Sequence, residues 1–255
     1  MNKQKVVMVT GGAQGIGAAI VKRLGKVGYK VAIADLKLKA AEKLAGELNS
    51  EGQTAMAIKV NVADRSSMFN AVETVADYFG GFDVLINNAG LGPVTPIKEI
   101  SPEEFDKVMN VNVGGDIWGI QAALEQFINN TRHGHEIIGK IINATSQAGV
   151  VGNKNTLVYS SSKFAVRGLT QVAAKDLADQ GITVNAYAPG IVETPMMEKI
   201  TQKQGLTMND YTSDIALKRL SSPDDVAKVV EFLVGENSNY ITGQTILCDG
   251  GIQFQ

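Results

Sequence analysis

The chain has 255 residues, of which 44% are hydrophobic and 20% charged, and its formal net charge is −2. This composition excludes an intrinsically disordered chain, and the near-neutral charge gives no overall basic field for nucleic acid. One cysteine and two histidines exclude an internal disulfide and leave few ligands for zinc. No apolar run approaches the roughly 20 residues of a membrane span, and the first one ends too early for a signal peptide, so we expect a cytoplasmic protein.

Short β-branched runs alternate with longer helical stretches along the whole chain. In chain order, the pattern predicts strand 5–9, helix 16–27, strand 31–34, helix 37–50, strand 55–60, helix 66–79, strand 84–86, helix 103–130, strand 140–144, helix 159–180, strand 183–188, helix 223–233 and strand 246–248. Such alternation is typical of an α/β fold: a Rossmann-like, doubly wound parallel sheet with helices on both faces. No linker or repeat divides it, so we expect a single domain over residues 1–255.

The segment 193–222 interrupts this alternation. It is polar, contains several methionines and lies between the strand at 183–188 and the last helix. Two interpretations are open: a surface excursion without a function, or a flexible substrate lid over a site.

A glycine-rich turn lies where the first predicted strand passes into the first helix. Gly11 permits a tight turn, Gly15 lets the backbone approach a pyrophosphate, and Gly17 allows close packing of helix on strand. The helix N-terminus there favours an anion. The spacing predicts a cofactor phosphate site formed by Gly11, Gln14, Gly15, Ile16 and Gly17, although an ordinary structural turn uses the same residues.

Asp35 ends the second predicted strand, 18 positions after Gly17. A carboxylate there accepts hydrogen bonds from a ribose diol and repels a 2′-phosphate, which favours NAD over NADP. Gln14 carries no charge for such a phosphate, and Lys37 is the nearby cation that could weaken the preference. A role of Asp35 as a helix N-cap is compatible with this one.

Tyr159 and Lys163 are four residues apart at the start of a predicted helix, so the phenol and the ammonium share a face. One cation about 4 Å away supplies roughly the 4 kcal/mol that lowers a tyrosine pKa by about three units. Ser146 follows the strand at 140–144, at the sheet edge where such folds bind ligands. Each residue alone is more typical of an ordinary helix or turn; together they predict proton transfer by a tyrosine.

These motifs occur in one order over nearly the whole chain, and the set resembles the short-chain dehydrogenase/reductase family. The matching segments are Thr10-Gly11-x-x-x-Gly15-x-Gly17, Asn87-Asn88-Ala89-Gly90, Asn112, Ser146, Tyr159-x-x-x-Lys163 and Pro189-Gly190. The resemblance implies an NAD(H)-dependent oxidoreductase and a homotetramer packed through long helices.

The resemblance also implies roles for individual residues. Tyr159 would be the acid and base, Ser146 would orient the carbonyl, Lys163 would bind ribose and tune the tyrosine, and Asn112 would hold a relay water. The family commonly has Asp at position 61, where this chain has an asparagine that keeps an acceptor. Further cofactor contacts would come from Asn61, Val62, Asn88, Ala89, Gly90, Pro189, Gly190, Val192 and Thr194.

Within this family, the acetoin (diacetyl) reductases and 2,3-butanediol dehydrogenases are most similar. The resemblance lies in residues 117–123, 146–149 and 158–170. It implies that Gln147 and Asn153 line the substrate pocket beside Ser146 and Tyr159 and help to choose the hydroxyl configuration, with a hint of the meso diol. Residues 131–138 look longer than usual for the subgroup, and the excursion after Met197 looks shorter.

Two other functions remain open. One is a 3-oxoacyl carrier-protein reductase or another secondary-alcohol dehydrogenase; the other is a nucleotide-sensing protein without turnover. A complete Asn/Ser/Tyr/Lys set argues against the second. His133 and His135 lie in a polar stretch without a further ligand nearby, so we expect no metal.

Overall fold

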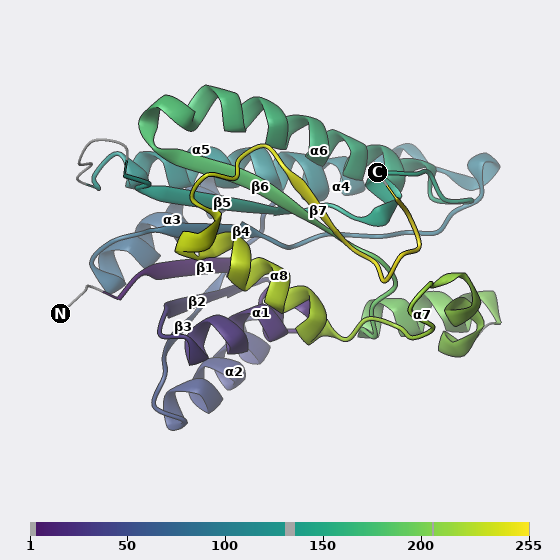
Figure 1. Ribbon diagram of the computed structural model, residues 1–255, viewed down its shortest axis with the longest axis horizontal. Helices are drawn as coiled ribbons and strands as arrows, with labels where there is room; N and C mark the ends of the chain where they lie inside the picture. The colour runs from purple at the N-terminus through teal and green to yellow at the C-terminus, as the bar shows by residue number, and fades with distance from the viewer. Residues whose placement is uncertain (1–3, 131–135, 206, 255) are drawn as a thin grey trace.

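The computed structural model describes residues 4–130, 136–205 and 207–254. Its centre is a single parallel sheet of seven strands in the order β3-β2-β1-β4-β5-β6-β7 (Figure 1). The strands are β1 (Val6–Thr10), β2 (Lys30–Asp35), β3 (Thr54–Lys59), β4 (Val84–Asn87), β5 (Gly139–Ala144), β6 (Ile182–Pro189) and β7 (Thr245–Cys248).

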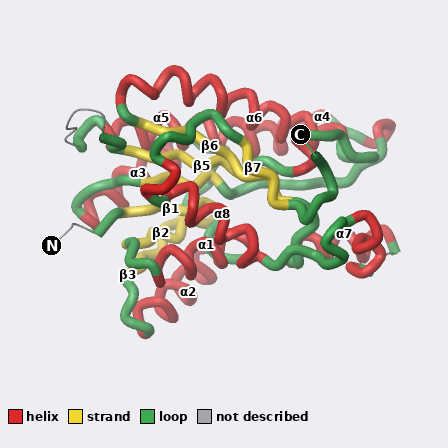
Figure 2. Tube along the Cα trace, in the orientation of Figure 1, coloured by secondary structure: helices red, strands yellow, loops and turns green. Residues whose placement is uncertain are grey.

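Helices cover both faces of this sheet, as Figure 2 shows. They are α1 (Gly15–Lys26), α2 (Leu38–Ser50), α3 (Arg65–Phe79), α4 (Pro102–Met109), α5 (Gly115–Phe127), α6 (Leu157–Leu177), α7 (Pro195–Gln204) and α8 (Pro223–Val234). One apolar core lies between the sheet and α1, α2 and α8, and a second lies between the sheet and α3, α5 and α6. The doubly wound α/β fold predicted from the alternating pattern is therefore confirmed.

The central strands are buried on both faces, which explains their uninterrupted apolar sequence. β1 reads VVMVT and all its residues are buried, as are those of β4 and β6. Parallel strands covered by helices on both sides need such runs instead of alternating polar and apolar residues. The predicted strands differ from the observed ones by at most one residue at either end.

The prediction of one continuous helix over residues 103–130 is wrong. The chain forms α4, then a five-residue π-helical segment (Asn110–Gly114), then α5. Asn112 lies in this segment, fully buried, and its side chain bonds the backbone of Leu91 and the hydroxyl of Ser162. A π turn widens the helix and often occurs at functional sites.

The segment 193–222 contains a helix that the sequence pattern did not predict. Thr194 caps it, since its hydroxyl accepts from Met197 N at 3.3 Å, and Pro195 occupies its first position. This helix, α7, projects from the sheet beyond the carboxyl ends of the strands (Figure 1). Polar residues obscure its apolar periodicity.

The strand order reverses between β1 and β4, and this reversal places the site. The connections after these strands run to opposite sides of the sheet and leave a crevice at their carboxyl ends. The chain after β1 is the glycine-rich turn, and the chain after β4 is Asn88–Gly90. Within the described ranges, no helix is long and apolar enough to cross a membrane.

Candidate active site

The glycine-rich turn joins β1 to α1 in the predicted geometry. Gly11 and Gly15 have φ values of +62° and +55°, which L side chains rarely adopt. A Cβ at Gly17 would overlap the carbonyl oxygen of Gly11, so only glycine lets helix and turn approach this closely. The first turn of α1 contains no acidic residue, and Gln14 makes no side-chain cap, so its N–H groups can meet an anion.

Asp35 lies at the end of β2 beside this turn and is held by two backbone groups. Its Oδ2 accepts from Ala13 N at 3.1 Å, and its Oδ1 accepts from Lys37 N at 2.9 Å. The carboxylate is thus fixed next to the glycine-rich turn, where it could accept from a ribose diol. Lys37 donates its ammonium to Gln14 Oε1 at 3.0 Å, so the nearby cation is engaged in a neighbouring contact.

Asn88 braces the turn against the end of β4. Its Nδ2 donates to Thr10 O at 2.9 Å and to Gly11 O at 3.2 Å, and its Oδ1 accepts from the Tyr187 hydroxyl at 2.9 Å. Thr10 completes this brace, because its hydroxyl accepts from the N–H groups of Asn88 and Ala89. The sequence motif includes Thr10 but does not indicate this bracing role, and it does not indicate Tyr187, which has no signal apart from its place in β6.

Tyr159, Ser146 and Lys163 meet at the carboxyl end of β5. Lys163, on α6, donates its ammonium to Ala144 O at 2.7 Å and is buried. Ser146 begins a short 3₁₀ turn (Gln147–Gly149), in which its hydroxyl accepts from Ala148 N at 3.1 Å. Thr145 fixes α6 to this turn by donating to Lys163 O at 2.8 Å. The sequence therefore brings hydroxyl, phenol and ammonium together as predicted.

Burial dominates the protonation of these groups. It raises the pKa of Tyr159, and the Ser146 hydroxyl acts in the opposite direction. It lowers the pKa of Lys163, which buried Asp116 opposes. The protein alone thus does not produce the lowered tyrosine pKa expected from Lys163. A proton shuttle at neutral pH needs further positive charge beside the phenol.

Asn112 is placed beside Lys163 by the π-helical segment. Its Oδ1 accepts from Leu91 N at 2.8 Å, and its Nδ2 donates to Leu91 O and Ser162 Oγ, both at 2.9 Å. A Cβ at Gly90 would lie 3.4 Å from both Asn112 Oδ1 and Lys163 Nζ. Asn112 therefore ties the loop after β4 to α6, with both of its N–H donors engaged and one lone pair of Oδ1 left for a further donor.

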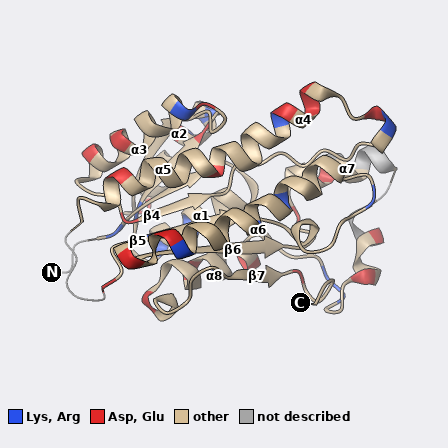
Figure 3. Ribbon diagram, turned by 90° about the horizontal axis from the view of Figure 1, so that it is seen from above, with Lys and Arg blue, Asp and Glu red and all other residues tan. Residues whose placement is uncertain are grey.

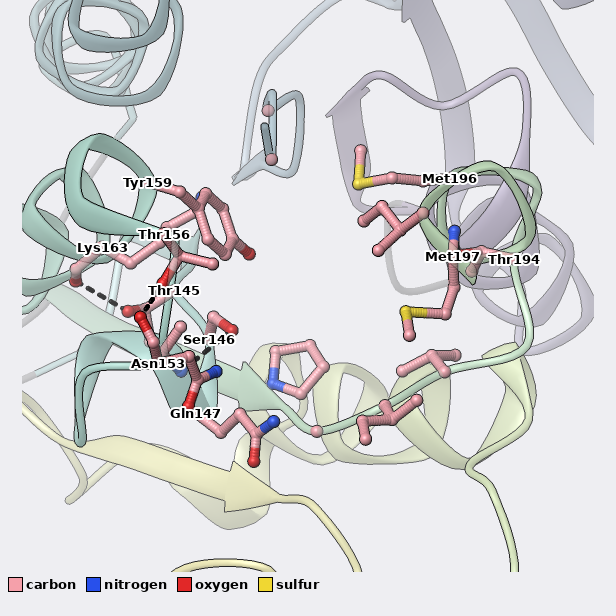
Figure 4. Close-up of a pocket in the computed structure, with 18 of the residues that line it drawn as sticks. Thr145, Ser146, Gln147, Asn153, Thr156, Tyr159, Lys163, Thr194, Met196 and Met197 are labelled. Carbon is pink, nitrogen blue, oxygen red and sulfur yellow. Dashed lines mark hydrogen bonds between the residues drawn. The ribbon is translucent and has the colours of Figure 1, made fainter. Parts of the chain in front are cut away.

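A cavity of about 640 Å³ opens in front of Tyr159 and Ser146. Figure 4 shows Met196 and Met197 of α7 across it from Ser146 and Gln147. The predicted residues that line it are Ile16, Asn88, Gly90, Ser146, Gln147, Asn153, Tyr159, Lys163, Pro189, Gly190, Val192 and Thr194. Further lining residues, which the motifs did not indicate, are Leu91, Gly92, Val94, Ile191, Ile200, Tyr211, Asp214, Ile252 and Gln253.

The remaining predicted cofactor residues lie along the sheet edge, outside this cavity. Val62 is buried against α5, where a Cβ at Gly115 would lie 3.1 Å from it. Asn61 is exposed beside it, and its Oδ1 accepts from Ala63 N at 3.3 Å. Together with Asp35 and the glycine turn, they extend the site from the cavity to β3. His133 and His135 lie outside the described residues.

These features fit an extended dinucleotide. The helix N-terminus of α1 could hold the phosphates, Asp35 a ribose, and the cavity the reacting ring beside Tyr159. The fit rests on the turn at Gly15, which forms a cradle that a side chain would fill. A Cβ built on Gly15 would point into it, and its nearest neighbour would be Thr194 Cγ2, 3.6 Å away. Such an arrangement suits hydride transfer coupled to proton transfer by the phenol.

Known proteins match the chain over its whole length. A diacetyl reductase [(S)-acetoin forming] from Staphylococcus aureus is 55% identical, covering 100% of both chains. An L-2,3-butanediol dehydrogenase from Corynebacterium glutamicum is 44% identical, covering 98% of this chain and 99% of its own. A blue fluorescent protein from a metagenomic library, solved in complex with NADPH, is 33% identical with a TM-score of 0.88 and covers 100% of both chains.

The family model described as short chain dehydrogenase matches residues 5–205. This range contains the glycine turn, Asp35, the Asn112 segment and the Tyr159–Lys163 pair, while the relatives extend the likeness to the C-terminal strand. The chain belongs to the short-chain dehydrogenases and is an oxidoreductase of that family.

Proposed function

We propose that the protein catalyses reversible hydride transfer between NAD(H) and a small ketone or secondary alcohol, with diacetyl, acetoin and 2,3-butanediol as substrates. The relatives named for diacetyl reduction and butanediol oxidation support this substrate class. Because those names specify (S)-acetoin and the L-diol, we expect the same configuration here instead of the meso diol that Gln147 and Asn153 suggested. Hydride would be supplied or accepted by the nicotinamide.

The site residues have the following roles in the proposal. Tyr159 donates its phenolic proton to the carbonyl oxygen in reduction and takes it back in oxidation. Ser146 donates a hydrogen bond to the same oxygen as negative charge grows there. Lys163 supplies positive charge beside the phenol, and Asn112 holds the relay that returns a proton from solvent.

Gln147 carries the argument for a substrate with two neighbouring oxygens. Its Oε1 is buried at the cavity and has no hydrogen-bond partner among the described residues. An unpaired buried acceptor is costly unless a ligand pairs with it. The hydroxyl of acetoin, next to the carbonyl held by Ser146 and Tyr159, supplies that donor. The amide N–H₂ of the same side chain serves a second carbonyl.

NAD is the proposed cofactor because of Asp35. Its carboxylate accepts two backbone N–H groups and faces the place of the adenosine ribose, where a 2′-phosphate would be repelled. A structural relative was solved in complex with NADPH, so the fold itself does not exclude the phosphorylated cofactor. The residue at this position therefore decides the preference, and Asn61, Val62 and the turn complete the adenosine side.

The segment 193–222 is proposed as the substrate lid. Met196, Met197 and Tyr211 come from it to line the cavity, and an isolated bridge between Val192 and Ser221 holds its two ends together. Because the bridge holds the two ends of the segment together while α7 projects beyond them, the segment could move as a hinged lid.

A homotetramer is proposed from the apolar surface of α5 and α6. Phe164 and Val172 are exposed on α6, and α5 carries only two charged residues, Asp116 and Glu125 (Figure 3). Exposed apolar helix faces of this kind mark protein interfaces. We place the enzyme in the cytoplasm, in keeping with its single cysteine, Cys248.

Substrate comparison with a Gln147→Leu variant tests the proposal. The wild type should reduce diacetyl and acetoin with NADH and prefer both to 2-butanone, which lacks the second oxygen. The variant should lose about tenfold or more in kcat/KM for acetoin and little for 2-butanone, because one hydrogen bond is worth about 1–3 kcal/mol in a buried site. Equal loss for both ketones would remove Gln147 from recognition. Faster turnover of a 3-oxoacyl thioester than of diacetyl would contradict the substrate class.

A further inference from the structure

One buried acid beneath the site has no part in the roles given above. Asp116 is the second residue of α5 and follows Asn112 by four positions. It is 4% exposed, and its Oδ2 has no hydrogen-bond partner among the described residues. A buried carboxylate normally gains hydrogen bonds or a counter-ion, so this carboxyl needs an explanation.

The backbone of Asp116 is fixed to the carboxyl end of the sheet. Asn87, at the end of β4, donates its Nδ2 to Asp116 O at 3.4 Å and to Asn143 Oδ1 on β5 at 3.0 Å. Asn143 in turn donates to Thr170 Oγ1 on α6 at 3.0 Å. This buried network holds α5, the sheet and α6 together at the level of Lys163, which donates to Ala144 O on β5.

Lys163 is the buried cation at this end of the sheet. A Cβ at Gly90 would lie 3.4 Å from both Lys163 Nζ and Asn112 Oδ1, and Asp116 follows Asn112 by about one helical turn. Burial raises the pKa of Asp116 and lowers that of Lys163, and in both cases the partner's charge opposes burial. The other titratable groups at this place are Tyr187 on β6 and Tyr159 on α6. Arg65 and Glu73, on the neighbouring α3, face solvent. Asp116 and Lys163 therefore form a pair whose charges depend on one another.

We propose that Asp116 is a positioning residue of the reaction, a buried counter-ion that keeps Lys163 protonated when the surroundings become alkaline. While its carboxyl is neutral, the charge on Lys163 acts undiminished on Tyr159. When the carboxyl loses its proton, the pair becomes neutral overall and Lys163 retains its own proton. Asp116 acts through Lys163 without touching the substrate, and the inference uses the proposed function only where turnover is measured.

The pH dependence of alcohol oxidation tests this role. In Asp116→Asn, the alkaline limb of kcat/KM should move to lower pH by about half a unit or more, because Lys163 loses its counter-ion. Glu125→Gln removes a carboxylate from the exposed face of the same helix and should leave the profile in place. If Asp116→Asn lowers kcat/KM at every pH but leaves the alkaline limb at the same pH, the proposal is overturned.

Infrared spectroscopy tests the pair without turnover and without relying on the folding of an Asp116 variant. The wild type should show the C=O band of a protonated buried carboxyl at about pH 6. An ordinary aspartate, with a pKa of about 3.9, is ionised at that pH and shows no such band. The band should disappear as the pH rises, and Lys163→Met should move its disappearance to higher pH. Absence of the band, or no movement in Lys163→Met, would overturn the proposal. Either result is independent of which ketone the enzyme reduces.

Discussion

Single side chains at the sheet edge carry the proposed chemistry, and the sequence indicates most of them. The spacing of Tyr159 and Lys163 predicts a shared helix face, and Asp35 follows a strand at the place where dinucleotide-binding folds of this kind hold a ribose. The bracing role of Thr10, which the motif includes, and any role of Asp116 escape prediction, because a threonine in a strand and an aspartate near a helix start are ordinary in sequence. The role of Thr10 appears only when the loop after β4 folds against it, and that of Asp116 only when α6 brings Lys163 to the same buried end of the sheet.

Asp35→Asn tests the cofactor preference at this scale. The asparagine keeps an acceptor for Ala13 or Lys37 but loses the charge that repels a 2′-phosphate. We expect the ratio of kcat/KM for NADH to that for NADPH to fall about tenfold or more, since a hydrogen bond to a charged group is worth about 1.5–3 kcal/mol. Glu42→Gln, an exposed change on α2, is the control. An unchanged ratio in Asp35→Asn would mean that other residues choose the cofactor.

Elements are predictable where one periodicity runs undisturbed. Strands β1, β4 and β6 read as buried apolar runs, and α1, α2 and α3 show a clear apolar face. The single helix predicted at 103–130 fails because the side-chain bonds of Asn112 favour a π turn, an effect of tertiary contacts. The polar composition of α7 hides it, since its apolar residues face a cavity instead of a core.

The 3₁₀ turn after β5 allows a test of element packing. A Cβ at Gly149 would lie 2.5 Å from Thr145 Oγ1 and 2.6 Å from Lys163 O, which are fixed to each other by a hydrogen bond. Gly149→Ala should therefore lower the free energy of unfolding by about 1–3 kcal/mol and reduce activity by displacing Lys163. Gly152→Ala, where a Cβ meets nothing within 4 Å, should change the stability by less than about 0.5 kcal/mol. Equal urea midpoints for the two variants would contradict this packing.

At the scale of the whole molecule, stability should depend on pH through Asp116. Its folded-state pKa is raised above the value of about 3.9 for an unfolded aspartate, so the native protein binds the extra proton. The stabilisation is complete below that value and is lost as the pH rises through the folded-state pKa. Relative to Asp116→Asn, the wild type should lose up to about 1.4 kcal/mol of unfolding free energy per pH unit in this window. Urea unfolding of both proteins from about pH 5 to 8 measures the difference, and a constant difference would contradict it.

The exposed apolar surface of the molecule also predicts its oligomeric state. Light scattering after size-exclusion chromatography should give the mass of four copies of the 27.1 kDa chain. Phe164→Glu and Val172→Glu place charges on the exposed apolar face of α6 and should lower that mass. A wild-type monomer with full activity would contradict the tetramer. From the sequence alone, only the family resemblance implies this interface. Helix periodicity does not distinguish an apolar face that is buried between subunits from one that is buried in the core.

The most direct measurement is the oxidation of NADH with diacetyl by the wild type and by Tyr159→Phe, together with NADH binding by both. The phenylalanine keeps the ring that lines the cavity and removes the hydroxyl that donates the proton. General acid catalysis contributes about 10²–10⁴-fold, so turnover should fall by at least about 100-fold. NADH binding should remain nearly unchanged. Retention of most of the turnover in Tyr159→Phe would contradict proton transfer by this tyrosine.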